Sequence, residues 1–305
     1  MDKTVSLKAY WDMGTDGKAS ARLPSWLRAG REVSPDFRRV ASCLDRHGLA
    51  TVCVAARCPN RNRCWSSGTA TFMILGQRCT RNCRFCAVEH SPPKAPEADE
   101  PARVARAVEE LGLRYAVITS VTRDDLPDGG ASQFSETVRQ IRRRTVNTLI
   151  EVLVPDFHGN MRAAAAVLEA GPDVFAHNLE TVRRLQAAVR PAADYERSLK
   201  VLATAAGLGG ARVAVKSGIM VGLGETEEEV EETLRDLRAT GCTMVTIGQY
   251  LQPRRECMPV RRFVDPETFQ CYSQIARELG FRSVVSGPLV RSSFMAAEAF
   301  RLLGR

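Results

Sequence analysis

The 305-residue sequence lacks any apolar run near the roughly 18 residues that a membrane-spanning helix requires. It also has no apolar segment near its first residue of the kind that directs secretion. Asp2, Asp12 and Asp16 argue against the acid-poor leaders that direct proteins to organelles. We therefore expect a cytoplasmic protein that does not associate with a membrane.

Aromatic residues are scarce, at 6% of the chain, and no basic stripe is interleaved with them. This disfavours single-stranded nucleic acid as a ligand, because its bases stack on aromatic side chains. The net charge of +8 favours an acidic partner. We interpret the arginine-rich runs at 139–144 and 183–190 as solvated helix faces. The charge therefore predicts an acidic protein substrate and no nucleic acid.

Disulfides are not expected, although the chain has ten cysteines, because the cytosol keeps thiols reduced. Four cysteines stand apart and are interpreted as small buried residues or inert surface thiols: Cys43, Cys242, Cys257 and Cys271. The other six fall between Cys53 and Cys86. Such a concentration of thiols indicates metal binding.

The chain from Thr69 onward alternates short apolar runs with longer helical patterns. The apolar runs predict strands at 71–75, 115–121, 148–154, 173–176, 212–220 and 244–250. The helical patterns lie at 101–111, 131–143, 161–170, 181–189, 195–206 and 226–240. This alternation predicts an α/β fold with a parallel sheet and right-handed crossovers. Six such units predict a partial (β/α)6 barrel, a curved sheet that does not close.

Two extensions flank this predicted barrel. Residues 1–68 are rich in turn formers and charge, with short helical pieces around Phe37 to His47, and form an N-terminal extension. We assign 69–264 to the barrel and 265–305 to a C-terminal extension with one more helix. Ligands of such barrels bind at the C-terminal ends of the strands, so we expect the chemistry there.

Cys79, Cys83 and Cys86 form a CxxxCxxC motif soon after the first predicted barrel strand. A [4Fe–4S] cluster normally takes four cysteines, so three cysteines leave one iron open to a substrate or cofactor. Such an iron can bind the amino and carboxylate groups of S-adenosylmethionine. Zinc is the alternative, although zinc sites favour paired CxxC spacing with a fourth Cys or His.

A second set of cysteines lies upstream, with the spacing CxxxxCxxxxxC: Cys53, Cys58 and Cys64. This spacing fits another iron–sulfur cluster that is short of one protein ligand. Three unevenly spaced cysteines also fit a zinc site or a redox-sensitive loop. The residues alone leave these three interpretations open.

The CxxxCxxC motif resembles the signature of the radical S-adenosylmethionine superfamily. With ITSVTRDDLPDGGA, HNLETV, KSGIMVGLGET, QYLQP and SGPLVRSS, the chain is similar to the lipoyl synthase family from Trp26 to Phe294. The resemblance implies reductive cleavage of S-adenosylmethionine to methionine and a 5′-deoxyadenosyl radical. It further implies insertion of two sulfur atoms at C6 and C8 of an octanoyl group on a lipoyl carrier protein.

The resemblance also implies two [4Fe–4S] clusters and their ligands. Cys79, Cys83 and Cys86 would hold the cluster that binds S-adenosylmethionine, and the upstream cysteines would hold an auxiliary cluster. The fourth auxiliary ligand would be Ser292, which could otherwise simply cap the helix predicted from Phe294. A small electron-donor protein and an iron–sulfur carrier protein would be further partners.

Polar residues at the predicted strand ends are candidates for binding S-adenosylmethionine. Thr119 and Ser120 could bond its aminoacyl part, and Asn178 and Glu180 its ribose hydroxyls. Glu180, like Asp124, could instead cap a helix. Two further sets have similar alternatives: Phe85 could contact the adenine or pack against the barrel mouth, and Gly218, Gly222 and Gly224 could admit the adenosine or only form a turn.

Several positions depart from the pattern of the family: Val54, Ala55, Ala176, Arg254, Cys257 and Phe294. None of them is an expected cluster ligand, so the departures concern substrate contacts and the surroundings of the auxiliary cluster. Two alternatives to the lipoyl synthase interpretation follow. One is a paralogous enzyme that inserts sulfur into a different unactivated chain, and the other is a zinc-stabilised binding protein without catalysis.

Overall fold

The computed structural model describes residues 23–28 and 33–304. Its main sheet has eight strands in the order β1-β2-β5-β6-β7-β8-β9-β10. Every neighbouring pair is parallel except β1 with β2. The strands are β1 (Ala50–Thr51), β2 (Thr71–Ile74), β5 (Tyr115–Ser120), β6 (Leu149–Leu153), β7 (Val174–Ala176), β8 (Ala214–Val221), β9 (Met244–Gln249) and β10 (Ser283–Gly287). The two end strands do not pair, so the barrel is open as predicted.

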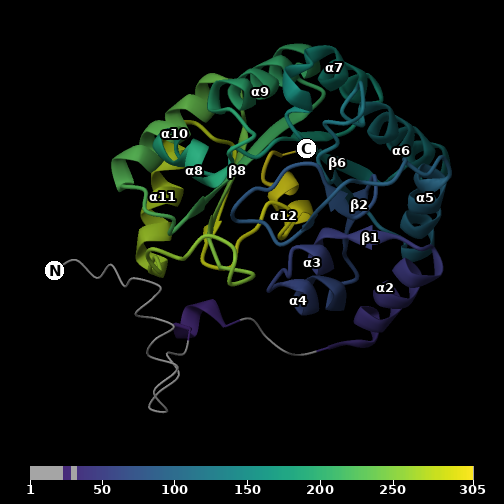
Figure 1. Cartoon of the computed structure of the whole chain (residues 1–305), viewed down its shortest axis with the longest axis horizontal. Helices are drawn as coiled ribbons and strands as arrows, with labels where there is room; N and C mark the ends of the chain where they lie inside the picture. Colours follow the sequence, from purple (N-terminus) through teal and green to yellow (C-terminus); the bar gives the residue numbers. More distant parts are fainter. Residues whose placement is uncertain (1–22, 29–32, 305) are drawn as a thin grey trace.

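Helices cover the outside of this curved sheet and form the ring seen in Figure 1. They are α2 (Pro35–Arg46), α5 (Glu100–Leu111), α6 (Ala131–Arg144), α7 (Met161–Glu169), α9 (Tyr195–Gly209), α10 (Glu227–Ala239) and α11 (Pro266–Glu278). Local signals set several boundaries. Thr226 and Glu229 form a capping box at the start of α10, and Gly112 ends α5 with a φ of 62°. No helix among the described residues is long and apolar enough to cross a membrane.

All six predicted strands are present, and five of the six predicted barrel helices are continuous. The helix predicted at 181–189 is wrong. The chain remains extended at Val182, and a 3-10 turn, η3 (Arg183–Leu185), precedes the short helix α8 (Gln186–Val189). Glu180, with a φ of 71°, forms a bridge with Ile219 of β8, and this pairing keeps the chain out of a helix.

Both extensions contribute a strand that the sequence analysis did not predict. β1 joins the sheet beside β2, and β10 joins it beside β9. The upstream extension also holds η1 (Ser25–Leu27) and the short helices α3 (Val52–Ala55) and α4 (Arg61–Ser66). A separate two-stranded sheet pairs β3 (Arg78–Cys79) with β4 (Glu89–His90). The domain boundaries at residues 68 and 264 therefore remain a prediction. The main sheet includes strands from all three segments.

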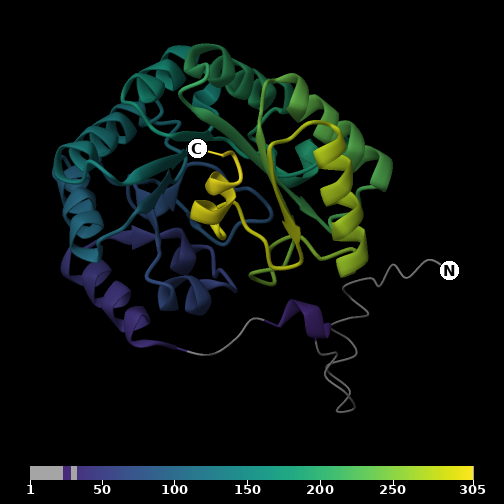
Figure 2. The ribbon, with the colours of Figure 1, turned by 180° about the vertical axis from the view of Figure 1, so that it is seen from behind.

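The last helix, α12 (Ala296–Arg301), lies inside the ring in both views (Figures 1 and 2). Its Phe300 packs with Tyr115 and Met244, which begin β5 and β9. Because these residues lie at the N-terminal ends of the strands, the helix closes that end of the barrel. Nearby, the buried Lys216 Nζ donates to both Glu151 carboxylate oxygens at 2.8 and 2.9 Å. The open end is therefore the C-terminal one.

Candidate active site

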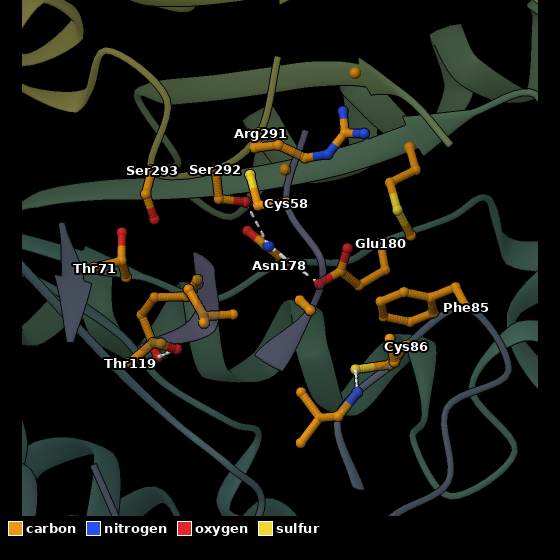
Figure 3. A pocket seen from close by; sticks show the side chains of 18 of the residues that line it. Cys58, Thr71, Phe85, Cys86, Thr119, Asn178, Glu180, Arg291, Ser292 and Ser293 are labelled. Carbon is orange, nitrogen blue, oxygen red and sulfur yellow. Dashed lines mark hydrogen bonds between the residues drawn. The ribbon is translucent and has the colours of Figure 1, made fainter. Parts of the chain in front are cut away.

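A cavity of about 420 Å³ lies at the C-terminal ends of the barrel strands (Figure 3). All six clustered cysteines line it: Cys53, Cys58, Cys64, Cys79, Cys83 and Cys86. The predicted S-adenosylmethionine contacts Phe85, Thr119, Ser120, Asn178 and Glu180 line it too, as does Ser292. The structure therefore brings the predicted cluster ligands and these five predicted contacts together on one cavity. Of the three glycines that could admit the adenosine, Gly218 lines the cavity, whereas Gly222 and Gly224 do not.

Main-chain N–H groups surround two thiols of the downstream motif. Cys79 Sγ accepts from the N–H of Arg81 at 3.4 Å and from that of Thr122 at 3.3 Å. Cys86 Sγ accepts from the N–H of Val88 at 3.5 Å. Hydrogen bonds of this kind favour the thiolate, which is the form that binds metal.

The buried Arg81, between Cys79 and Cys83, anchors the loop to the barrel. Its guanidinium forms two hydrogen bonds with Asp124, at 2.6 and 2.8 Å, and lies 2.7 Å from Asp156. Asp156 in turn accepts from Arg197 of α9 at 2.8 Å. The sequence gives no sign of this role for Arg81, because the two carboxylates that its guanidinium contacts lie on different loops. Asp124 is thus an ion-pair partner and does not cap a helix.

The upstream cysteines are held by short helices and by contacts to distant loops. Cys53 lies in α3, Cys64 in α4 and Cys58 between them. The Arg57 guanidinium donates to the Pro253 carbonyl at 3.3 Å, and the Asn60 amide donates to the Leu289 carbonyl at 2.6 Å. These bonds fasten the upstream segment to the loops after β9 and β10.

Burial raises the pKa of thiols in both sets. The pKa of Cys86 rises to about 12 and that of Cys83 also rises, in each case mainly through loss of hydration. In the upstream set the pKa of Cys64 rises to about 12, and that of Cys58 rises, again chiefly through burial. Bound cations deprotonate such thiols, so both sets suit metal ligation.

The spacing of the thiols can be compared with the spacing of ligands around a single zinc ion. Four ligands around zinc with bonds of about 2.3 Å put neighbouring sulfurs roughly 3.8 Å apart. Among residues 23–28 and 33–304, only Cys43, His47 and Glu110 bring three such donor atoms within 4.8 Å of one another. That group lies outside the cavity, where Glu110 pairs with Arg46 and His47. Among the described residues of the two cavity sets, no three donor atoms lie as close together as the ligands of a zinc ion.

Ser292 does not cap a helix, since α12 begins at Ala296 behind Met295. Instead, its Oγ accepts a hydrogen bond from the Asn178 amide at 2.6 Å. The same amide nitrogen donates to Glu180 Oε1 at 3.1 Å (Figure 3). Burial raises the pKa of Glu180. The serine, the amide and the carboxylate form a short chain across the cavity.

Unpaired buried polar atoms test whether the cavity suits S-adenosylmethionine. Ser120 Oγ and Asn178 Oδ1 are buried and have no hydrogen-bond partner. Leaving such groups unpaired costs about 1–3 kcal/mol each, so a ligand with amine, carboxylate and hydroxyl groups fits here. Thr119 is a weaker candidate, because its hydroxyl already donates to the Leu153 carbonyl at 2.9 Å.

Besides Arg57, two arginines that the sequence analysis did not name line the cavity. Arg190 falls in the run at 183–190 that was interpreted as a solvated face, and this interpretation is wrong for it. Arg190 is 8% exposed and donates to the carbonyls of Asn178 and Leu179 at 3.1 and 3.2 Å. Arg291 precedes Ser292, and burial lowers its pKa. Arg190 stands in no motif that the sequence analysis quoted, whereas Arg291 stands in SGPLVRSS, from which only Ser292 was named as a site residue.

The residues that depart from the family pattern differ in how far they are buried. Val54 is 49% exposed on α3, whereas Ala176 is fully buried in β7. Cys257, interpreted as an isolated thiol, lies 3.5 Å from the Cys86 carbonyl. Phe294 lines the cavity, and the Arg63 guanidinium lies 5.1 Å from its ring centroid. Only Phe294 of these four faces the cavity directly.

Comparison with known proteins places the chain in a family. The model of the radical SAM superfamily matches residues 73–237. A lipoyl synthase of Pyrobaculum arsenaticum is 53% identical, covering 92% of this chain and 95% of its own. One of Caldanaerobacter subterraneus subsp. tengcongensis is also 53% identical, covering 91% and 96%.

Solved structures with low identity share the fold alone. The hydrogenase maturase HydG of Carboxydothermus hydrogenoformans has a TM-score of 0.58 at 14% identity, over 76% of this chain and 56% of its own. Methylornithine synthase has a TM-score of 0.53 at 14% identity, over 88% and 78%. With the match over residues 73–237 and the identity of 53% over nearly the whole length, the chain belongs to the lipoyl synthase family of the radical SAM superfamily.

Proposed function

We propose that this chain inserts two sulfur atoms, at C6 and C8, into an octanoyl group carried by a lipoyl carrier protein. Radical SAM enzymes use an iron–sulfur cluster and S-adenosylmethionine, and the match to that superfamily assigns both to the chain. The observation that carries the proposal is the meeting of two separate cysteine sets and Ser292 on one cavity. One cluster would suffice for cofactor cleavage, so the second set of cysteines indicates a second chemical step.

The residues that would hold these groups follow from their positions. Cys79, Cys83 and Cys86 would hold the cluster that binds S-adenosylmethionine. Cys53, Cys58, Cys64 and Ser292 would hold the auxiliary cluster. When bound, the first cluster with S-adenosylmethionine supplies a carbon radical able to attack unactivated C–H bonds, and the auxiliary cluster supplies sulfide.

The remaining residues bind and orient. Ser120 Oγ and Asn178 Oδ1 would take up polar groups of S-adenosylmethionine, and the Arg190 side chain holds Asn178 in place through its carbonyl. Apolar side chains line the wall nearby, among them Val52, Met73, Val121, Leu153 and Ile219. Such a wall suits an alkyl chain and excludes water from the reacting carbons.

The proposal has consequences for partners. The substrate would be an octanoylated carrier domain, which we expect to be acidic because the chain has a net charge of +8. Cofactor cleavage needs electrons, so we expect a small electron-donor protein. Loss of sulfide at each turnover calls for an iron–sulfur carrier protein.

The test is mass spectrometry of an octanoylated lipoyl-domain peptide after anaerobic incubation with the reconstituted chain, S-adenosylmethionine and a reductant. The expected product has two added sulfurs and, as the dithiol formed in the presence of the reductant, an unchanged number of hydrogens, because each hydrogen removed from carbon is replaced by a proton on sulfur. A parallel incubation with octanoic acid in free form tests whether a carrier is needed. Formation of 5′-deoxyadenosine without any sulfur in the peptide would overturn the proposal and favour the paralogous enzyme.

A further inference from the structure

Asn178 hydrogen-bonds both to Ser292, a proposed auxiliary ligand, and to Glu180, a proposed S-adenosylmethionine contact. Its amide nitrogen lies 2.6 Å from Ser292 Oγ and 3.1 Å from Glu180 Oε1. Figure 3 shows Ser292 beside Cys58, with Asn178 between it and Glu180. An amide nitrogen can only donate, so Ser292 Oγ is the acceptor.

The surroundings fix Asn178 in this position. Its main-chain carbonyl accepts from Arg190 at 3.1 Å, and the next N–H, of Leu179, donates to Ser217 Oγ at 3.3 Å. Gly218 provides the room. A Cβ on Gly218 would lie 3.0 Å from Asn178 Oδ1, 3.1 Å from Ser292 Oγ and 2.5 Å from Thr246 Oγ1. The pair thus depends on a glycine in the middle of β8.

Ser292 itself stands on a segment without helix or strand, between β10 and α12. An unsupported serine there could take several rotamers, and only some would face the thiols. A hydroxyl oxygen has two lone pairs, and donation from Asn178 occupies one of them. The other lone pair remains available to a metal ion.

We propose that Asn178 is the positioning residue that aims Ser292 at the auxiliary cysteines and links it to Glu180. This inference rests on the proposed function, because it takes Ser292 as an auxiliary ligand. Partners that orient a metal ligand through hydrogen bonds affect metal affinity by about 10-fold to 100-fold. Asn178 is expected to act in this way on the iron that Ser292 binds.

The experiment uses the full chain with Cys79, Cys83 and Cys86 replaced by Ala, so that only the auxiliary set remains. After anaerobic reconstitution, iron content and the rate of iron loss to a chelator are measured. Asn178→Ala should lose iron about tenfold faster than this background chain, in line with the loss of one ligand-orienting hydrogen bond. Ser292→Ala should lose iron at least as fast.

The variant that combines Asn178→Ala with Ser292→Ala tests whether Asn178 acts through Ser292. If Asn178 acts through Ser292, Asn178→Ala with Ser292→Ala should lose iron no faster than Ser292→Ala alone. An equal acceleration by Asn178→Ala in both backgrounds would show a general loosening of the site and overturn the inference. Ser293→Ala is the matched control, since Ser293 lies next to Ser292 and lines the same cavity. It should lose iron at the background rate.

Two outcomes separate this inference from the proposed function. A background chain that takes up no iron would overturn the auxiliary site and the inference together. Normal uptake with an unchanged rate in Asn178→Ala would overturn the inference alone. Asn178→Asp keeps the side-chain volume and removes the amide donor, so it should also lose iron faster, even if Asn178→Ala folds poorly.

Discussion

The two cysteine sets meet in one cavity, but the chain holds them differently. Cys79 and Cys86 accept main-chain N–H groups, and buried Arg81 fastens their loop to carboxylates on two other loops. The upstream set stands on short helices fastened by single bonds from Arg57 and Asn60 to distant carbonyls. Ion pairs in the barrel suit a group that stays through many turnovers. The lighter fastening suits a group that is dismantled and replaced.

The largest effect is expected at the downstream set. Replacing Cys79, Cys83 or Cys86 by Ala should abolish formation of 5′-deoxyadenosine, because each thiol holds the cluster that passes the electron. High-performance liquid chromatography of anaerobic reactions measures this product. Substantial 5′-deoxyadenosine from any of these variants would contradict the assignment of the loop.

The upstream set should separate the two activities. Replacing Cys53, Cys58 or Cys64 by Ala should leave 5′-deoxyadenosine measurable but stop sulfur insertion, because the source of sulfide is lost. Both products are quantified from the same reaction. A variant that still makes lipoyl product would exclude the auxiliary set as the source of sulfur.

The anchoring of the downstream loop can be broken without touching a thiol. Arg81→Gln leaves the buried Asp156 with Arg197 as its remaining cation, beside the N–H of His158, and removing one partner of a buried pair costs about 3 kcal/mol. Urea unfolding of the cluster-free chain measures this loss. Arg183→Gln is the control, because its pairs are exposed and should contribute at most about 1 kcal/mol. Equal losses in the two variants would contradict the proposed role of Arg81.

His177, which lines the cavity, predicts that the free energy of unfolding depends on pH. Burial, and then the charge of Arg190, lowers the pKa of His177 to about 4 from 6.5, and His177 Nε2 is buried without a partner. A lowered pKa contributes stability that is present above 6.5 and lost as the pH falls toward 4. Between pH 6.5 and 5.5 the cluster-free chain should lose about 1 kcal/mol from this group, because the unfolded imidazole is only half protonated at pH 6.5.

Urea unfolding at several pH values measures that slope. His177→Asn should flatten it, while His90→Asn, at an exposed histidine, is the control for removing an imidazole elsewhere. If the slope of the parent chain persists in His177→Asn, another group is responsible.

The smallest effect is expected at the departures from the family pattern. Phe294 is buried against Arg63, and a tyrosine hydroxyl there would add one hydrogen bond worth about 0.5–1.5 kcal/mol. We expect the unmodified gene to restore growth of a host without its own lipoyl synthase. The comparison gene carries Val54→Glu, Ala55→Glu, Ala176→Asn, Cys257→His and Phe294→Tyr. Rescue by the comparison gene alone would mean that these positions set specificity.

Local patterns predicted much of this protein. The six barrel strands are apolar runs buried on both faces, which sequence alone displays, and the cysteine spacing identified the metal-binding loops. Strands β1 and β10 were missed because they are short and mixed in character, and pairing with β2 and β9 makes them strands. The helix at 181–189 failed because a bridge between Glu180 and Ile219 overrides local propensity.

The sequence by itself determined which residues could bind metal and which barrel would carry them, because motif spacing and hydrophobic periodicity are local properties. Only the tertiary structure decided how they meet. Asn178 and Ser292 are 114 positions apart and 2.6 Å from each other, and Arg81 finds carboxylates from two loops. Such pairs arise when a sheet curves and brings its strand ends together, and no window of sequence contains both partners.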